Sequence, residues 1–227
     1  MSKISLSTPY KKGFSRTRRN RGIVLSDVDG TLVKGSVVLG HAVSLHKNGV
    51  LDLGDLPSRW MKDQKNESVI KDLAEAYREG IIGKTEAEIM ADEYVNRLVS
   101  NPANFYSTMW RLRSLRGTGT RVVLVSGSPS FLVDRFARYY GFDSQASHYY
   151  QDPFGRFTGG CDGMFTGAAK KKYLGRLHLS RYPSITAFGD TQSDLPLFER
   201  AGYRVLVEPN SQTRSVIGHM ANEIVHH

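Results

Sequence analysis

Two aspartates lie two positions apart where the first apolar run of the chain ends. In "GIVLSDVDGTLVKGS" (22–36), Asp27 and Asp29 follow the apolar residues and Gly30 comes directly after them. Like charges at this spacing repel each other, so an ordinary turn is rarely built in this way. The pair indicates either a solvated loop or a site that uses its two carboxylates differently.

Four short apolar runs indicate strands that are buried on both faces of a parallel sheet, at 22–27, 121–126, 184–190 and 204–208. Helical patterns lie between them. One helix is predicted to start with Ser128 as its N-cap and Pro129 at its first position, and to end at Gly141. Two more are expected over 169–180 and 192–202. This alternation predicts a doubly wound, Rossmann-like α/β core.

The region between the first two strands breaks this alternation. It contains three helical patterns: "NESVIKDLAEAYREG", "TEAEIMADEYVNRLVSNP" and "NFYSTMWRLRSL". The second opens with Thr85 and Glu88 in capping-box spacing. We therefore predict an all-helical cap domain over 37–116, inserted into an α/β core formed by 22–36 and 117–227.

Polar side chains follow the predicted strands at the edge where an open α/β sheet binds its ligands. Lys170 lies at the start of the helix that precedes the third strand. We expect one crevice to collect four carboxylates, a hydroxyl and an ammonium: Asp27, Asp29, Asp190, Asp194, Ser126 and Lys170.

These residue types point to phosphoryl transfer. Clustered carboxylates without Cys or His favour a hard cation, Mg²⁺. An ionised Asp27 could then attack phosphorus and form an aspartyl-phosphate. Ser126, the backbone N–H groups around Gly127 and Lys170 would hold the phosphoryl oxygens. Asp29 would protonate the leaving oxygen and then activate water, which gives each aspartate of the opening pair its own task.

The same motifs resemble those of haloacid dehalogenase-like phosphatases, in particular the phosphoserine phosphatase branch with a helical cap. They are "DVDGT" (27–31), "VLVSGS" (123–128), Lys170 in "GAAKKKYL" and "GDTQSDLPLF" (189–198). The resemblance implies that Mg²⁺ binds the Asp27 side chain, the backbone carbonyl of Asp29, and Asp190. It also implies that Asp194 acts through water and by pairing with Lys170.

Two positions depart from that family pattern. Ser36 stands where phosphoserine phosphatases carry a glutamate that reaches the amino group of the substrate, and Ser193 stands where they usually carry an asparagine. The substitution at Ser36 argues against an amino-acid phosphate. Arg59, Lys62 and Lys65 are candidate substrate contacts in the cap that the sequence does not distinguish from ordinary surface charges.

The formal net charge of +9 is concentrated at the N-terminus. Residues 1–21 hold seven basic residues and no acid, whereas the remainder has 24 basic and 22 acidic residues. This segment is interpreted as a flexible arm able to contact RNA, anionic lipid or an acidic partner.

The lone Cys161 suits a reducing compartment, so a cytoplasmic location is expected. No apolar run reaches the ~18–20 residues that a membrane span requires.

Three functions remain open on this reading. The first is a Mg²⁺-dependent phosphomonoester hydrolase that acts on a small phosphorylated metabolite. The second is a phosphotransferase that passes the same phosphoryl group to an alcohol. The third is a nucleic-acid-associated protein that acts through the basic arm. The sequence indicates neither the oligomeric state nor a role for the histidines His226 and His227.

Overall fold

A six-stranded parallel sheet forms the centre of the protein, which confirms the predicted parallel sheet and adds two strands to the four that the sequence indicates. The computed structural model describes residues 22–62, 67–163 and 167–227. The strand order is β3-β2-β1-β6-β7-β8, and each neighbouring pair runs parallel. The strands are β1 (Ile23–Ser26), β2 (Arg121–Pro129), β3 (Asp143–Ser147), β6 (Ile185–Gly189), β7 (Tyr203–Val207) and β8 (Glu223–Val225).

Helices cover both faces of this sheet, which makes the core doubly wound. Val24 of β1 joins the apolar cluster that contains residues of α5 and α6. Its neighbours Ile23 and Leu25 point the opposite way, into a second cluster that contains residues of the C-terminal helices. The covering helices are α5 (Ser107–Gly117), α6 (Ser130–Tyr140), α7 (Gly167–Leu174), α8 (Leu195–Phe198) and α9 (Ser211–Ile217).

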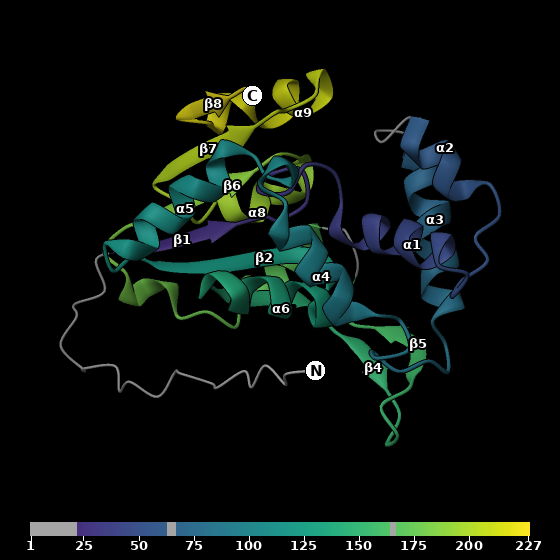
Figure 1. The fold of residues 1–227 in the computed structure, drawn as a ribbon. Helices are drawn as coiled ribbons and strands as arrows, with labels where there is room; N and C mark the ends of the chain where they lie inside the picture. The colour runs from purple at the N-terminus through teal and green to yellow at the C-terminus, as the bar shows by residue number, and fades with distance from the viewer. Residues whose placement is uncertain (1–21, 63–66, 164–166) are drawn as a thin grey trace, which may run out of the picture.

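All regular elements described between β1 and β2 are helical. Four α-helices and a 3₁₀ turn at Pro102–Asn104 precede α5. The α-helices are α1 (Val37–Lys47), α2 (Leu56–Lys62), α3 (Glu67–Gly80) and α4 (Ala91–Ser100). Figure 1 shows α1, α2 and α3 grouped to one side of the sheet, whereas α4 lies against α6. Because α5 also contacts β2, the division of the chain at 36/37 and 116/117 stays a prediction.

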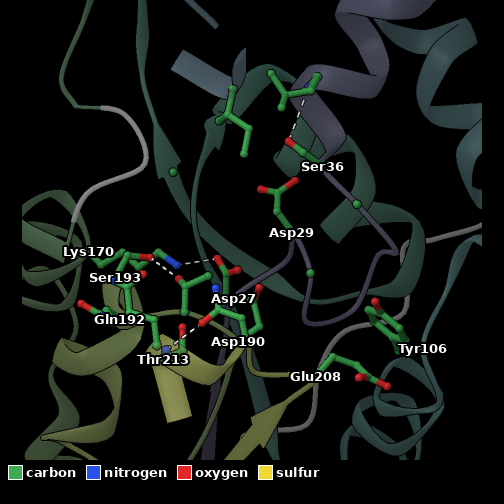
Figure 2. A pocket seen from close by; sticks show the side chains of 18 of the residues that line it. Asp27, Asp29, Ser36, Tyr106, Lys170, Asp190, Gln192, Ser193, Glu208 and Thr213 are labelled. Carbon is green, nitrogen blue, oxygen red and sulfur yellow. Dashed lines mark hydrogen bonds and ion pairs between the residues drawn. The ribbon is translucent and has the colours of Figure 1, made fainter. Parts of the chain in front are cut away.

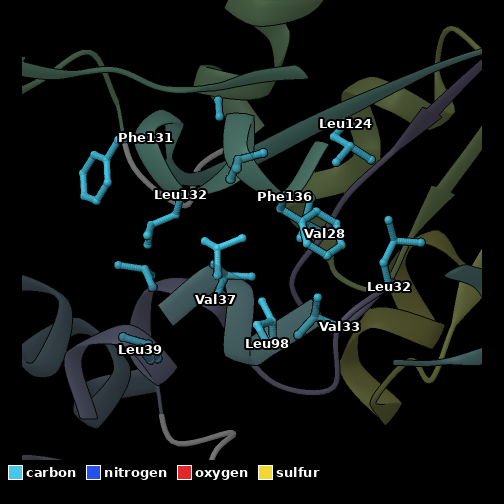
Figure 3. Close-up of a cluster of buried hydrophobic side chains, with 14 of the residues drawn as sticks. Val28, Leu32, Val33, Val37, Leu39, Leu98, Leu124, Phe131, Leu132 and Phe136 are labelled. Atoms are coloured by element: carbon cyan, nitrogen blue, oxygen red, sulfur yellow. The ribbon is translucent and has the colours of Figure 1, made fainter. Parts of the chain in front are cut away.

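An apolar cluster fixes the loop after β1 between the sheet and the first helix (Figure 3). Val28 and Leu32 are fully buried in it, together with Val37 at the start of α1 and Phe136 of α6. Val28 lies between Asp27 and Asp29 in the chain. Burial of this one side chain therefore orients the two flanking carboxylates, because successive residues of an extended segment point in opposite directions.

The structure corrects four helix predictions. The helix predicted to open with Thr85 and Glu88 starts only at Ala91, although Thr85 and Glu88 do form the hydrogen bonds of a capping box. Ser128 is no N-cap, because β2 continues to Pro129 and α6 starts at Ser130 without a side-chain cap. Gly141 does end α6, with a φ of 68°. The helix predicted over 169–180 ends at Leu174, next to the weak helix former Gly175. The helix predicted over 192–202 is a short 3₁₀ turn followed by the four residues of α8.

A two-stranded hairpin was not predicted from the sequence. It consists of β4 (Tyr149–Gln151) and β5 (Phe157–Cys161), and Figure 1 shows it projecting below α6. Backbone hydrogen bonds between Phe157 and both Gly83 and Lys84 attach it to the turn after α3. Within the described part of the chain, no helix is long and apolar enough to cross a membrane.

Candidate active site

A buried lysine joins two aspartates at the carboxyl edge of the sheet. The Nζ atom of Lys170 lies 2.6 Å from Oδ1 of Asp27 and 2.5 Å from Oδ1 of Asp194. Lys170 is only 2% exposed, whereas the neighbouring Lys171 and Lys172 are exposed. Of the three adjacent lysines, Lys170 is therefore the one held in the site. It lies on α7 and connects the segments that follow β1 and β6.

Asp194 acts as a structural acceptor at both of its oxygens. Its Oδ1 receives Lys170, and its Oδ2 accepts the backbone N–H groups of Asp190 and Thr191 at 3.0 and 3.1 Å. The side chain is fully buried. The contact with Thr191 is half of a capping box, in which the Thr191 side chain accepts the backbone N–H of Asp194, and it shapes the turn after β6. The contact with the Asp190 N–H fixes the backbone of Asp190.

Asp190 is placed by contact with the turn that follows Asp29. Thr31 donates its hydroxyl to Oδ1 of Asp190 at 3.0 Å. Gly30 has a φ of 73°, and a Cβ atom there would lie 2.8 Å from Cγ of Asp190. Glycine is thus required both for the left-handed backbone and for the close approach of the two loops.

Asp29 is held by three donors, and two of them come from β2. Its Oδ2 accepts the hydroxyls of Ser126 and Ser128 at 3.2 and 2.7 Å, while its Oδ1 accepts the backbone N–H of Val37. Val37 is the first residue of α1, so this carboxylate links the strand edge to the first inserted helix. Sequence reasoning missed Ser128 because a serine before proline is also the usual signature of a helix start.

A cleft of about 570 Å³ opens over these groups (Figure 2). Asp27, Asp29, Lys170, Asp190 and Gly127 form its floor. Ser36 and Ser193 lie in its walls, and Gly30 and Gly35 lie beside the floor. The sequence did not single out the other wall residues as contacts: Leu39, Trp60, Ile70, Tyr106, Thr191, Gln192, Glu208, Asn210, Gln212 and Thr213. Gly30, Thr191 and Gln192 belong to two of the quoted motifs, whereas the rest of these wall residues are revealed only by their position in the folded chain.

The predicted cap contacts lie elsewhere. Arg59 and Lys62 are exposed on α2 and do not line the cleft, and Lys65 lies outside the described residues. Ser126 is fully buried and is also absent from the cleft wall. Its predicted contact with a phosphate stays a prediction.

Burial sets the charge states of the buried acids. It raises the pKa of Asp27 from 3.8 to about 7, although the nearby Lys170 acts in the opposite direction. Burial, with the charges of Asp27 and Asp194, also raises the pKa of Asp190 well above its ordinary value. For Lys170, burial disfavours the ammonium, but Asp194 and Asp27 overcome this effect and raise its pKa.

The acids of the site fit a hard divalent cation. Asp27, Asp190 and Asp194 each offer an oxygen, and these atoms lie within 4.8 Å of one another. Asp194 already accepts four hydrogen bonds, whereas Oδ2 of Asp27 and Oδ2 of Asp190 have no hydrogen-bond partner among the described residues. One buried ammonium against three carboxylates leaves excess negative charge, which a divalent ion bound by these oxygens would offset.

The comparison with protein families assigns the chain to one of them. Residues 24–199 match the haloacid dehalogenase-like hydrolases. The chain belongs to this family. A phosphoserine phosphatase from Archaeoglobus fulgidus is 26% identical over 204 residues, which cover 83% of this chain. The chain spans about half the length of that relative, 53%.

Solved structures share the fold at low sequence identity. A protein of unknown function from Bordetella pertussis Tohama I superposes with a TM-score of 0.70 at 18% identity, covering 91% of this chain and 98% of its own. A phospho-aspartyl intermediate analogue of phosphoserine phosphatase gives a TM-score of 0.58 at 16% identity, covering 91% and 93%. These likenesses show that the chain shares its fold with both structures.

Proposed function

We propose that the chain is a Mg²⁺-dependent phosphomonoester hydrolase that works through an aspartyl-phosphate at Asp27. The observation that carries this proposal is the buried contact of Lys170 with Asp27, next to Asp190 and with Asp29 two residues further on. A nucleophile, a cation for phosphoryl oxygens and a second carboxylate for proton transfer thus face one cleft. The family membership and the phosphoserine phosphatase relative support the same reaction class.

In the first half-reaction a carboxylate oxygen of Asp27 attacks phosphorus, and the bond from phosphorus to the substrate alcohol oxygen breaks. Asp29 gives a proton to that departing oxygen. Lys170 and the backbone N–H groups around Gly127 bind the phosphoryl oxygens, where charge accumulates in the transition state. The alcohol then leaves, and the phosphoryl group stays on Asp27.

In the second half-reaction Asp29 removes a proton from water, whose oxygen attacks phosphorus. The bond from phosphorus to Asp27 breaks, and inorganic phosphate is released. Asp27, Asp190 and the backbone carbonyl of Asp29 would hold Mg²⁺, which when bound supplies positive charge against the repulsion between carboxylate and phosphoryl oxygens.

The test is release of inorganic phosphate from a panel of phosphorylated metabolites, with Mg²⁺ and with EDTA. We expect turnover that requires Mg²⁺ and is inhibited by Ca²⁺, whose looser coordination suits this site less well. The Asp27→Asn variant should lose more than about a thousandfold in turnover, as expected for a missing nucleophile. Asp134→Asn, an exposed aspartate on α6, is the matched control. Full activity in EDTA would contradict the proposal.

Phosphotransfer to an alcohol uses the same residues and is the alternative outcome of that assay. Adding glycerol or ethanol as an acceptor distinguishes the two, because a transferase forms a new phosphate ester in place of inorganic phosphate.

The basic arm at 1–21 lies outside the described residues. Its proposed contact with nucleic acid is tested by RNA and DNA binding with and without these residues across a salt series.

A further inference from the structure

We infer that the substrate is a monophosphate ester of an uncharged alcohol with an apolar body. This inference rests on the proposed phosphatase function and concerns the part of the cleft beyond the reacting groups. In Figure 2, Asp29 lies between Asp27 and Ser36, so the cleft continues from the proton-transferring carboxylate toward α1. The alcohol that Asp29 protonates must extend into this region.

That region of the cleft is lined by apolar side chains from three helices. Leu39 of α1, Trp60 of α2 and Ile70 of α3 all face the cleft, next to Ser36. The Ser36 hydroxyl accepts the backbone N–H of Leu39 as the N-cap of α1, at 3.4 Å. An apolar substituent on the substrate would lose water against these three side chains and gain free energy roughly in proportion to its buried area.

The charges of the cleft disfavour a second charged group on the alcohol. Among the described lining residues Lys170 is the single cation, and it is already paired with two aspartates. A second anionic group would therefore find no free cation and would meet further carboxylates. An ammonium beside Leu39, Trp60 and Ile70 would be desolvated without a carboxylate at position 36, because Glu208, the acidic lining residue outside the reacting group, lies beside Tyr106 and away from Ser36 (Figure 2). Of the acids in the inserted region that could supply this charge, Asp52 and Asp55 do not line the cleft, and Asp63 lies outside the described residues.

The test is kcat/KM for a series of n-alkyl monophosphates from ethyl to hexyl, with phosphoserine in the same panel. We expect kcat/KM to rise about threefold per added methylene and phosphoserine to be slower than propyl phosphate. Trp60→Ala and Ile70→Thr should flatten this dependence. Trp110→Ala, which removes a 40% exposed tryptophan of α5 outside the cleft, should retain it.

The outcomes separate this inference from the proposed function. Turnover of the alkyl series without any chain-length dependence, or a lead for phosphoserine, would overturn the inference and leave the phosphatase assignment intact. If the protein with Mg²⁺ releases phosphate from no ester in the panel, the proposed function and this inference fail together.

A separate observation assigns a positioning role to Ser128. Its side chain is fully buried, and its hydroxyl donates the shorter of the two serine hydrogen bonds to Oδ2 of Asp29, at 2.7 Å. A serine hydroxyl both donates and accepts, so Ser128 can hold Asp29 as a carboxylate and as a carboxylic acid. We propose that Ser128 keeps Asp29 aligned with the leaving alcohol oxygen in the first half-reaction and with the attacking water in the second.

Leaving groups of different basicity test this role. An alkoxide needs the proton of Asp29 in order to leave, whereas p-nitrophenolate leaves without it. Ser128→Ala should reduce kcat/KM for an alkyl phosphate by about tenfold and change kcat/KM for p-nitrophenyl phosphate by less than about twofold, because kcat/KM reports formation of the aspartyl-phosphate and not its hydrolysis, which both substrates share. Ser128→Thr, which keeps the hydroxyl, should restore the alkyl rate. Ser147→Ala removes another buried serine hydroxyl, bonded to the carbonyl of Gly163, and should leave both rates unchanged.

Equal losses for both substrates in Ser128→Ala would show a merely structural role and overturn this second proposal. Unchanged rates for both would overturn it as well. Neither result bears on Asp27 as the nucleophile, because attack by Asp27 precedes water activation with either substrate.

Discussion

Gly30 determines how closely the loops after β1 and β6 approach each other. Its φ of 73° is left-handed, and any side chain there would collide with the carboxylate of Asp190. The distance between the carboxylates of Asp27 and Asp190 therefore depends on the absence of a Cβ atom at Gly30. The sequence places Gly30 in a turn, but the contact with Asp190 is visible only in the fold.

Gly30→Ala should reduce the affinity for Mg²⁺ at least about tenfold, because Asp190 must move away from Asp27. It should also cost about 1 kcal/mol of stability through backbone strain. Gly49→Ala is the matched control: its φ is 68°, but no atom lies within 4 Å of the added methyl group. Magnesium titration calorimetry and denaturation of both variants measure the two effects. Equal magnesium affinity in the two variants would contradict this role of Gly30.

At the scale of the elements, His41 joins three of the inserted helical segments. It is fully buried on α1, with Nδ1 3.0 Å from the Tyr77 hydroxyl of α3 and Nε2 2.7 Å from the carbonyl of Ile89, just before α4. Burial lowers the pKa of His41 from 6.5 to about 4, against the raising effect of the Ile89 carbonyl. The folded protein therefore keeps this imidazole neutral.

This buried histidine predicts a loss of stability in acid. Between pH 6.5 and pH 4 the unfolded chain binds a proton at His41 that the folded chain does not, so stability falls as the pH falls. From pH 7.5 to pH 5 the free energy of unfolding should drop by about 2 kcal/mol more in the wild type than in His41→Gln. Urea denaturation at both pH values measures this, with the exposed His219→Gln as control. An equal pH dependence in wild type and His41→Gln would refute it.

The sequence predicts which polar residues lie together where they directly follow a strongly apolar strand. Asp27, Ser126 and Asp190 could be brought together because the carboxyl ends of parallel strands meet at one edge. It failed where the apolar signal is weak: β3 reads "DSQAS", β8 has three residues, and β5 contains Gly159 and Gly160. Nor could it find the cleft walls, since Leu39, Trp60 and Ile70 look like ordinary core residues of amphipathic helices.

At the scale of the whole molecule, the fold brings together carboxyl groups whose simultaneous ionisation is unfavourable. Because the folded-state pKa of Asp27 is about 7 in the metal-free protein, protons compete with Mg²⁺ for the site below that pH. Saturating Mg²⁺ should therefore raise Tm by about 5 °C at pH 8, and by much less at pH 5.5. Thermal unfolding with and without Mg²⁺ at both pH values tests this. A larger shift at the lower pH would contradict the proposed site.

The most direct test of the account is to trap the phosphorylated residue. The protein is mixed with Mg²⁺ and the best substrate of the panel, quenched during turnover and treated with borohydride, which reduces an aspartyl-phosphate to homoserine. Peptide mass spectrometry should then find homoserine at position 27, only when Mg²⁺ and substrate are both present, and never in Asp27→Asn. Turnover without modification of Asp27, or with the label on another residue such as Ser126, would contradict the central claim.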